Sequence, residues 1–361
     1  MVASMSYKSH SDLKTLAHSM SSSTCTAALA RYWTHFIGSI ARVMLLLGSW
    51  LLLIAPKAEA LIFFSTSDPA FNTTEPTGSL ANSGWQWQGT WSGGLGTAIG
   101  PHHFVTAKHL GGAIGDVFIL GTTPYFTLSS VDSVSSDLRI WEVLETLPSW
   151  AELYRSPDEL GKPLVVMGFG VSRGPEVRVS DVLKGWEWGT GAGTLRWGEN
   201  VVVGTNNYGP NIGPLLKARF DAGANANEAH LASNDSGGGV FIQEGGQWKL
   251  AGINYAVDGN FNTSTNGNGF SAALFDVGGL YVGWFGHWTF IQDQAYDIPS
   301  AFYATRVSVH AAWIDSVLGN NPPMDSEDVP LINSLTLSTL GFALSVVGSM
   351  RLRSHPREPR T

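Results

Sequence analysis

Residues 233–241 read Ser-Asn-Asp-Ser-Gly-Gly-Gly-Val-Phe, which places the hydroxyl of Ser236 on a glycine-lined turn just before an apolar strand. A second segment, Val-Thr-Ala-Lys-His at 105–109, ends an apolar strand on small residues followed by His109. Serine becomes a strong nucleophile only when a neutral imidazole takes its proton. The two segments together predict acyl transfer, with Ser236 as the nucleophile and His109 as the base.

A histidine base also needs a carboxylate on its other ring nitrogen, which fixes the tautomer and stabilises the imidazolium. Our candidate is Asp137, because it opens the alternating strand 137–143, where an acid can be held rigidly. Asp116 and Asp132 are alternatives. Asp116 follows the histidine closely, and Asp132 precedes a less regular run. The predicted catalytic residues are therefore His109, Asp137 and Ser236.

The composition predicts a turn-rich β protein. The chain has 361 residues with 42 glycines and 14 tryptophans, and only 14% of its residues are charged. Short apolar runs at 117–120, 164–167 and 201–203 are bounded by turn residues, as strands are. No repeat of about 20 to 50 residues is evident, which argues against a propeller or a solenoid. We expect an all-β barrel or sandwich.

The order of the three residues along the chain separates the folds that carry such a triad. Histidine, then aspartate, then serine is the order of the trypsin-like enzymes. An α/β-hydrolase needs its histidine after the serine and a Gly-x-Ser-x-Gly elbow, whereas position 234 is asparagine. The sequence also lacks alternating β and α units. An α/β-hydrolase is the weaker alternative.

The chain resembles the trypsin-like (chymotrypsin-fold) serine peptidases over residues 90–320. Residues 104–109 resemble the family's apolar-Thr-Ala-Ala-His motif, 137–140 its Asp-Leu/Ile-Ala-Leu strand, 234–240 its Gly-Asp-Ser-Gly-Gly-Pro-Val turn, and 303–318 its closing strand and helix. The resemblance implies an all-β fold of two six-stranded antiparallel β-barrels with the triad at their junction and a C-terminal α-helix. Residues 258–300 are predicted to be an insertion.

Three neighbours of the triad depart from the family or raise a question. The resemblance implies an oxyanion hole formed by the N–H groups of Asn234 and Ser236, where Asn234 replaces a glycine and tolerates unusual backbone angles. Lys108 replaces a small residue, and its amine either points to solvent or lowers the pKa of His109 by repulsion. Asp235 pairs in many family members with a newly cut N-terminus. We expect it to bond locally within its turn instead, because the predicted mature start lies far before the first strand.

The resemblance also suggests substrate-binding residues. His230 lies near the place of the family's pocket floor, although a histidine with no role in the pocket is an equal alternative. Strand 250–257 resembles the wall against which the family binds a peptide as an added strand. On that strand Tyr255 and Val257 are predicted to contact substrate, and Val257 is expected to narrow the pocket.

The N-terminal residues 1–60 are predicted to be an export signal with a long basic flank. An apolar stretch at 43–54 is followed by the small-x-small triplet 58–60, and an uncleaved membrane anchor is the alternative. The only cysteine, Cys25, lies in this leader, so the mature chain is expected to have no disulfide. Residues 61–89 are predicted to form an N-terminal arm that leads into the peptidase domain, 90–320.

The C-terminal residues are predicted to tether the protein. An acidic linker at 321–330 is followed by the uncharged segment 331–350 and the basic tail 351–361, the length and flank of a spanning helix. A weakly packed amphipathic tail is the alternative. The arrangement loosely resembles the C-terminal sorting signals called PEP-CTERM, with only Val329-Pro330 where that motif has Pro-Glu-Pro.

Charge and residue spacing exclude some functions. The formal net charge is −8, and basic residues concentrate in the leader and the tail, so the body is more acidic and a nucleic-acid partner is not expected. The ten histidines show no metal-ligand spacing, and no cofactor is expected. We predict an exported serine endopeptidase that acts on polypeptides at the cell envelope or cell surface, held to the membrane by its C-terminal segment, with release to the outside of the cell as the alternative. A catalytically inactive homologue serving as a surface-tethered binding module is the alternative.

Overall fold

The computed structural model describes residues 60–284 and 286–319. The predicted leader (except its last residue), acidic linker, apolar segment 331–350 and basic tail lie outside the described residues, so these assignments, including the sorting signal, remain predictions. Within the described part of the chain, no helix is long and apolar enough to cross a membrane.

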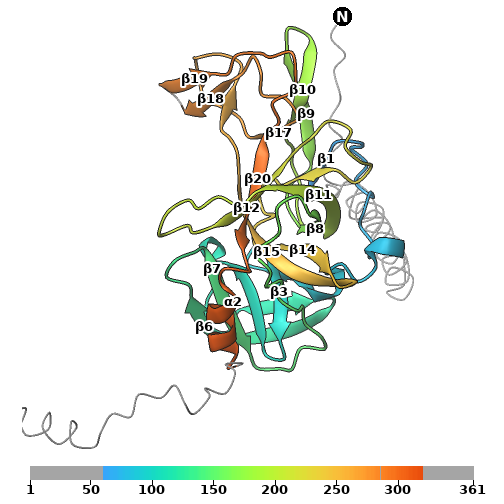
Figure 1. Ribbon diagram of the computed structural model, residues 1–361, viewed down its shortest axis with the longest axis vertical. Helices are drawn as coiled ribbons and strands as arrows, with labels where there is room; N and C mark the ends of the chain where they lie inside the picture. Colours follow the sequence, from blue (N-terminus) through green and yellow to red (C-terminus); the bar gives the residue numbers. More distant parts are fainter. Residues whose placement is uncertain (1–59, 285, 320–361) are drawn as a thin grey trace, which may run out of the picture. The chain divides into compact units, whose positions relative to one another are not determined.

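The first barrel contains β2 to β7 in the closed order β2-β3-β4-β7-β6-β5, with every pairing antiparallel. Figure 1 labels three of its strands, β3, β6 and β7. Its apolar interior is centred on Trp91, Phe104, Phe118 and Trp141. The strands are β2 (Gln88–Trp91), β3 (Gly94–Gly100), β4 (His103–Ala107), β5 (Val117–Leu120), β6 (Thr123–Asp132) and β7 (Leu138–Val143).

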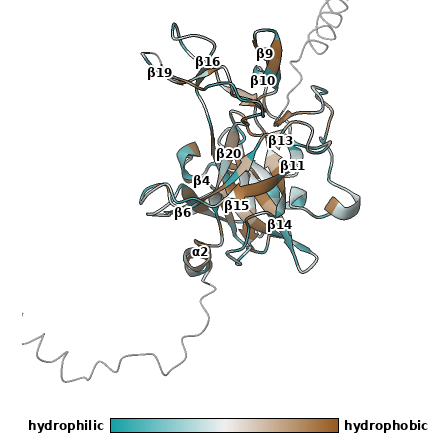
Figure 2. Ribbon diagram, turned by 45° about the horizontal axis from the view of Figure 1, so that its top comes forward, coloured by the Kyte–Doolittle hydropathy of each residue, from teal (hydrophilic) through white to brown (hydrophobic). Residues whose placement is uncertain are grey.

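The second barrel closes in the order β11-β12-β20-β15-β14-β8, again antiparallel throughout. Figure 2 shows hydrophobic residues along its strands β11 and β14 and mostly hydrophilic residues in the connecting loops. The strands are β8 (Pro163–Gly168), β11 (Arg196–Gly204), β12 (Leu215–Arg219), β14 (Gly239–Glu244), β15 (Gln247–Val257) and β20 (Ala301–Arg306). The prediction of two six-stranded antiparallel barrels is confirmed.

A third apolar core joins the two barrels. Strand β7 shows how: Leu138 and Ile140 pack into the joint core, whereas Trp141 and Val143 face the interior of the first barrel. Successive side chains of a strand point to opposite faces, so one strand serves two cores. The C-terminal helix α2 (Ala311–Leu318) packs against the joint core through Ala311 and Ile314. Within the segment 303–318 that resembles the family's closing strand and helix, the helix begins only at Ala311, because residue 307 forms a bend and residues 308–310 form a turn.

Additional strands surround the second barrel. The short β1 (Ile62–Phe63) pairs with β13 (Ala229–His230), so the start of the predicted arm is fastened to the barrel, with residues 60–63 at most 1% exposed. A sheet of β9 (Arg173–Val179), β10 (Val182–Trp188) and β17 (Ala272–Leu274) links the second barrel to the predicted insertion. The rest of the insertion contains β16 (Phe261–Asn262), β18 (Tyr281–Trp284) and β19 (His287–Phe290).

Candidate active site

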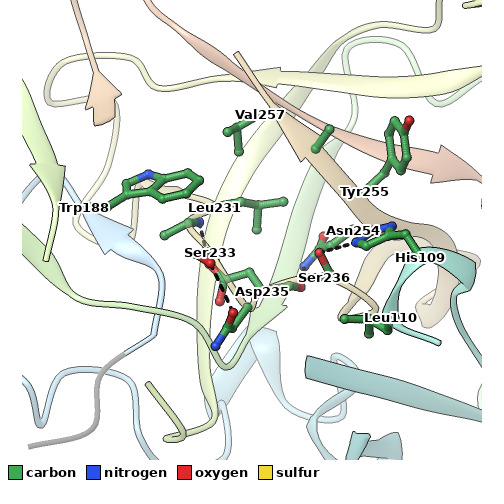
Figure 3. Close-up of a pocket in the computed structure, with 13 residues that line it drawn as sticks. His109, Leu110, Trp188, Leu231, Ser233, Asp235, Ser236, Asn254, Tyr255 and Val257 are labelled. Atoms are coloured by element: carbon green, nitrogen blue, oxygen red, sulfur yellow. Dashed lines mark hydrogen bonds between the residues drawn. The ribbon is translucent and has the colours of Figure 1, made fainter. Parts of the chain in front are cut away.

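The structure brings the three predicted catalytic residues together from both barrels. Figure 3 shows two of them, His109 and Ser236, with the hydrogen bond between their side chains. His109 lies in a 3-10 turn, Lys108–Leu110, directly after β4, and Asp137 lies directly before β7. Ala107 pairs with Leu138 in the β4–β7 ladder, and the N–H of Lys108 donates to the carbonyl of Asp137 at 2.8 Å, so the register of these two strands places Asp137 beside Lys108 and the adjacent His109. Ser236 lies in the turn between β13 and β14 of the second barrel.

The three side chains form a continuous chain of hydrogen bonds. His109 Nδ1 lies 2.5 Å from Asp137 Oδ2, and His109 Nε2 lies 2.8 Å from Ser236 Oγ. The backbone N–H of His109 also donates to Asp137 Oδ1 at 3.0 Å, so both carboxylate oxygens are held by one residue. Because a carboxylate only accepts, the neutral imidazole carries its proton on Nδ1 and leaves Nε2 free to accept from the serine hydroxyl.

The two alternative aspartates have other partners. Asp132 accepts two hydrogen bonds from Arg139, at 2.5 and 2.9 Å, and this pairing lowers the pKa of Asp132. Asp116 accepts from the backbone N–H of Ala113 at 2.8 Å. Of the three candidates, Asp137 is the one whose carboxylate reaches His109.

The turn around Ser236 leaves two backbone donors available. Asn234 has φ +73°, the left-handed conformation that glycine adopts without strain and that asparagine tolerates better than most residues. Within the described residues, neither the Asn234 nor the Ser236 backbone N–H has an acceptor. The carbonyl of Ser236 accepts from the backbone N–H of Leu95 at 3.0 Å, which ties the turn to the first barrel. Two such N–H groups are what an oxyanion requires.

Asp235 points away from the cleft and is fully buried. Its carboxylate accepts backbone N–H groups of Ala232 (2.7 Å), Phe169 (2.8 Å), Gly170 (2.6 Å) and Leu61. The expectation of purely local bonding is wrong, since three of these four donors are distant in the sequence. Burial raises the pKa of Asp235 to about 7, although the four hydrogen bonds oppose this rise. Among the described residues it has no cationic partner.

Lys108 corrects a second expectation. Its ammonium points neither to open solvent nor at the imidazole, because Nζ donates to the backbone carbonyls of Ser133 (3.0 Å) and Ser136 (2.9 Å). These carbonyls belong to the loop that leads into Asp137.

A pocket of about 340 Å³ opens beside Ser236. In Figure 3, Trp188 and Val257 lie on the side of Ser236 that is away from His109. Tyr255 and Val257 of β15, the two residues predicted to contact substrate, line this pocket. The Tyr255 ring contacts the His109 ring edge-on, with 5.9 Å between the ring centroids. The pocket is lined by His109, Leu110, Trp188, Leu231, Ala232, Ser233, Asn234, Asp235, Ser236, Asn254, Tyr255, Ala256 and Val257.

His230 does not belong to this pocket, so its predicted substrate contact is wrong. The side chain is fully buried, its Nδ1 donates to the carbonyl of Leu231 (2.7 Å), and its ring lies between Phe220 and Phe302 at 5.6 and 5.9 Å. Burial lowers the pKa of His230, so it is held neutral in the core of the second barrel. Leu231, the next residue, lines the pocket instead.

Several pocket residues were not predicted from the sequence, among them Leu231, Ala256 and the largest of them, Trp188. Trp188 ends β10, whose partner β17 comes from the insertion, and the backbone N–H of Trp188 donates to Ser271 at 2.9 Å. The sequence offers one signal, a Trp-Glu-Trp run at 186–188 closed by Gly189. That run alone does not indicate which of its side chains points into the pocket beside Ser236.

No protein-family profile matches the sequence, and no curated protein matches it. Several solved structures are similar to the chain. An inactive form of Rv3671c from M. tuberculosis is 15% identical, with 72% of this chain and 98% of that chain covered and a TM-score of 0.40. The active form of the Rv3671c protease from M. tuberculosis is 14% identical, with 72% and 95% covered and a TM-score of 0.39.

The passenger domain of plasmid encoded toxin, an autotransporter enterotoxin of enteroaggregative Escherichia coli, is 14% identical. The match covers 66% of this chain and 22% of that chain, with a TM-score of 0.38. Likenesses this distant carry no argument about function. The fold therefore rests on the strand pairings described above, and the site rests on its own distances.

Proposed function

We propose that this chain is an exported serine endopeptidase that uses His109, Asp137 and Ser236 as a catalytic triad. The observation that carries the proposal is the chain of hydrogen bonds from Asp137 through His109 to Ser236, at the mouth of a pocket. Nucleophile, base and orienting carboxylate all lie within hydrogen-bond reach of their partners, which is the geometric criterion for this chemistry.

The geometry supports the following sequence of steps. Ser236 Oγ attacks the scissile carbonyl carbon while His109 Nε2 takes the hydroxyl proton, and the carbonyl oxygen becomes an oxyanion facing the N–H groups of Asn234 and Ser236. The oxyanion collapses, the C–N bond breaks, and His109 gives its proton to the leaving amine. Water then attacks the acyl-enzyme with His109 again as the base, which releases the acid and restores Ser236.

The pocket supports a preference for an apolar side chain before the scissile bond. Its walls include Trp188, Leu231, Ala256 and Val257. The one acidic residue in its lining, Asp235, is turned toward backbone N–H groups and does not offer a free carboxylate to a basic side chain. A lysine or arginine would therefore be desolvated without a partner, at a cost of several kcal/mol.

Strand β15 supports binding of an extended peptide. It pairs with β20 as far as Val257, whereas its pairing with β14 ends at Ile253. On the β14 side, residues 255–257 have no strand partner within the described residues. An unpaired strand edge beside a nucleophile is suited to a substrate that adds as a further strand.

The test is covalent labelling with a serine-directed fluorophosphonate, with Ser236→Ala as the control. The proposal expects labelling of the processed protein and none of the variant. A folded, processed protein that does not label supports the alternative, an inactive homologue that serves as a surface-tethered binding module. A peptide-library cleavage profile then determines the preference at the pocket.

Export and membrane tethering are included in the proposal because of the sequence features of the two terminal segments alone. Mass spectrometry of the mature N-terminus tests cleavage after Ala60. Membrane fractionation of the full chain against a chain that ends at residue 330 tests the C-terminal tether. Equal release of both chains into the soluble fraction contradicts the membrane tether and leaves the proposed catalytic mechanism unaffected.

A further inference from the structure

Lys108 is next to the proposed base, His109. Its side chain extends from the turn 108–110 to the loop 133–136, which we call the aspartate loop because it leads into Asp137. Its Nζ donates to the carbonyls of Ser133 and Ser136, at 3.0 and 2.9 Å. The Ser136 carbonyl belongs to the peptide group that continues into Asp137. A donor held on this carbonyl therefore acts on the backbone from which the Asp137 side chain projects.

Besides the Lys108 ammonium, the aspartate loop is held by the N–H of Ser133, which donates to the carbonyl of Leu138 at 2.9 Å. Ser133 and Ser136 are at most 3% exposed, and their hydroxyls bond to each other at 2.7 Å. Asp132 is engaged by Arg139, and no carboxylate lies within ion-pair distance of the Lys108 ammonium among the described residues. The ammonium is thus committed to backbone carbonyls.

The backbone completes the connection between the two segments. The N–H of Lys108 donates to the carbonyl of Asp137 at 2.8 Å, and the N–H of His109 donates to Asp137 Oδ1 at 3.0 Å. Together with the two bonds from Nζ, four hydrogen bonds join residues 108–109 to residues 133–137, besides the Nδ1 contact itself. Hydrogen bonds from a charged donor are stronger than neutral ones.

We infer that Lys108 is a positioning residue: its ammonium fixes the loop 133–136 so that Asp137 meets His109 in the reactive geometry. The inference rests on the proposed function of the triad. Removing the ammonium leaves two buried carbonyls without their donor, and a loop relieves such a deficit by moving toward water. Misplacing a catalytic group by about 1 Å costs up to about a hundredfold in rate.

The experiment compares Lys108→Met, which keeps an unbranched side chain one atom shorter and removes the donors, with Lys108→Arg, which keeps a cationic donor. We expect Lys108→Met to lower kcat on a peptide substrate by roughly 10- to 100-fold with KM within about twofold. Lys108→Arg is expected to recover most of the loss. The control is Lys217→Met, a partly buried lysine of β12 over the Tyr303 ring, which should leave kcat unchanged.

A double-mutant cycle separates positioning from a general loss of stability. If Lys108 acts through Asp137, Lys108→Met costs no more than about twofold in kcat when Asp137→Ala is already present. A full additional loss in that background, a rise in KM instead of a fall in kcat, or an unchanged kcat in Lys108→Met would overturn the inference.

A second measurement does not depend on turnover. The proton between His109 Nδ1 and Asp137 Oδ2 is followed by proton NMR in the wild type, Lys108→Met and Lys108→Arg. We expect its resonance to move or broaden in Lys108→Met and to be retained in Lys108→Arg. An unchanged resonance in Lys108→Met contradicts the positioning role. Absence of labelling of the wild type by the fluorophosphonate contradicts only the proposed function.

Discussion

The backbone N–H of Leu61 donates a hydrogen bond to the buried carboxylate of Asp235. Leu61 itself is 1% exposed, has φ +54°, and directly follows the predicted cleavage site after Ala60. The residue next to the proposed nucleophile is therefore in contact with the first residue of the predicted mature chain. A positive φ is costly for leucine while its N–H is part of a peptide bond, and this constraint ends if that bond is cut.

Cleavage after Ala60 is expected to stabilise the protein and to increase its labelling by a fluorophosphonate. A free α-ammonium at Leu61 would neutralise Asp235, which otherwise must be buried without a cation. The uncut form is obtained with Ala58→Leu, which removes the small residue that the leader peptidase requires. The measurement is the labelling rate of the cut and uncut forms.

The pH dependence of stability should also differ between these two forms. In the uncut chain, the pKa of Asp235 is raised from 3.8 to about 7, so its stabilising contribution is full below about pH 4 and is lost as the pH rises through 7. In the cut chain the α-ammonium of Leu61 opposes this loss of stability up to about pH 8, because above that pH the ammonium loses its own proton. Thermal unfolding at pH 5 and pH 7.5 checks this, and Asp235→Asn should remove the difference. Equal pH profiles of the cut and uncut forms would contradict the pairing.

Asn234→Gly is expected to retain kcat within a few-fold, because glycine adopts φ +73° freely and keeps the backbone N–H. Asn234→Val should lower kcat by at least tenfold, since a β-branched residue resists this conformation and the N–H is expected to turn away from the oxyanion. The measurement is kcat of each variant by steady-state kinetics, with the substrate concentration set to the same multiple of each variant's KM. A fully active Asn234→Val would show that the left-handed conformation is not needed.

Trp188→Ala is expected to enlarge the pocket and to move the preference toward larger side chains. We expect kcat/KM for a phenylalanyl or tyrosyl substrate to rise about tenfold relative to a valyl or leucyl one. Trp284→Ala provides the control, because Trp284 is 65% exposed and does not line the pocket. The same shift in both variants would mean that Trp188 does not limit the pocket.

Glu159→Ala is expected to destabilise the protein by about 3 to 5 kcal/mol, because it leaves Arg306 buried without its partner. Glu159 is fully buried and accepts from Arg306 at 2.9 and 2.5 Å and from Ser308 at 2.5 Å. Burial alone would raise the pKa of Glu159, but these donors outweigh it and lower the pKa. The stabilisation is therefore present above about pH 4.5 and is lost as the pH falls further. Urea unfolding at pH 7 and pH 4 measures both effects.

The all-β class could be predicted because its signals are local, whereas the two six-stranded barrels were implied by the resemblance to the trypsin-like serine peptidases. Neighbouring residues alone predict the strands before His109 and after Asp137, and they also predict the glycine turn at Ser236. The choice of Asp137 over Asp132 was predicted from strand regularity. The structure adds the physical reason, which is that Arg139 occupies Asp132.

His230 shows why the pocket could not be predicted in the same way. It is adjacent to Leu231, and neighbouring side chains of an extended segment point in opposite directions, so a shift of one residue exchanges the core for the cleft. Position relative to Ser236 in the sequence does not fix this direction. The pairing of β13 with β1 does.

The sequence by itself determined the all-β class, the order of histidine, aspartate and serine, and the turn that presents Ser236, since each depends on a few neighbouring residues. Only the tertiary structure decided which groups from distant segments meet. The Trp188 side chain lines the pocket, the Lys108 ammonium reaches the loop 133–136, and the backbone N–H of Leu61 reaches Asp235. These contacts depend on strand register and barrel closure. Such long-range pairings are settled by the packing of the whole molecule and not by any one segment.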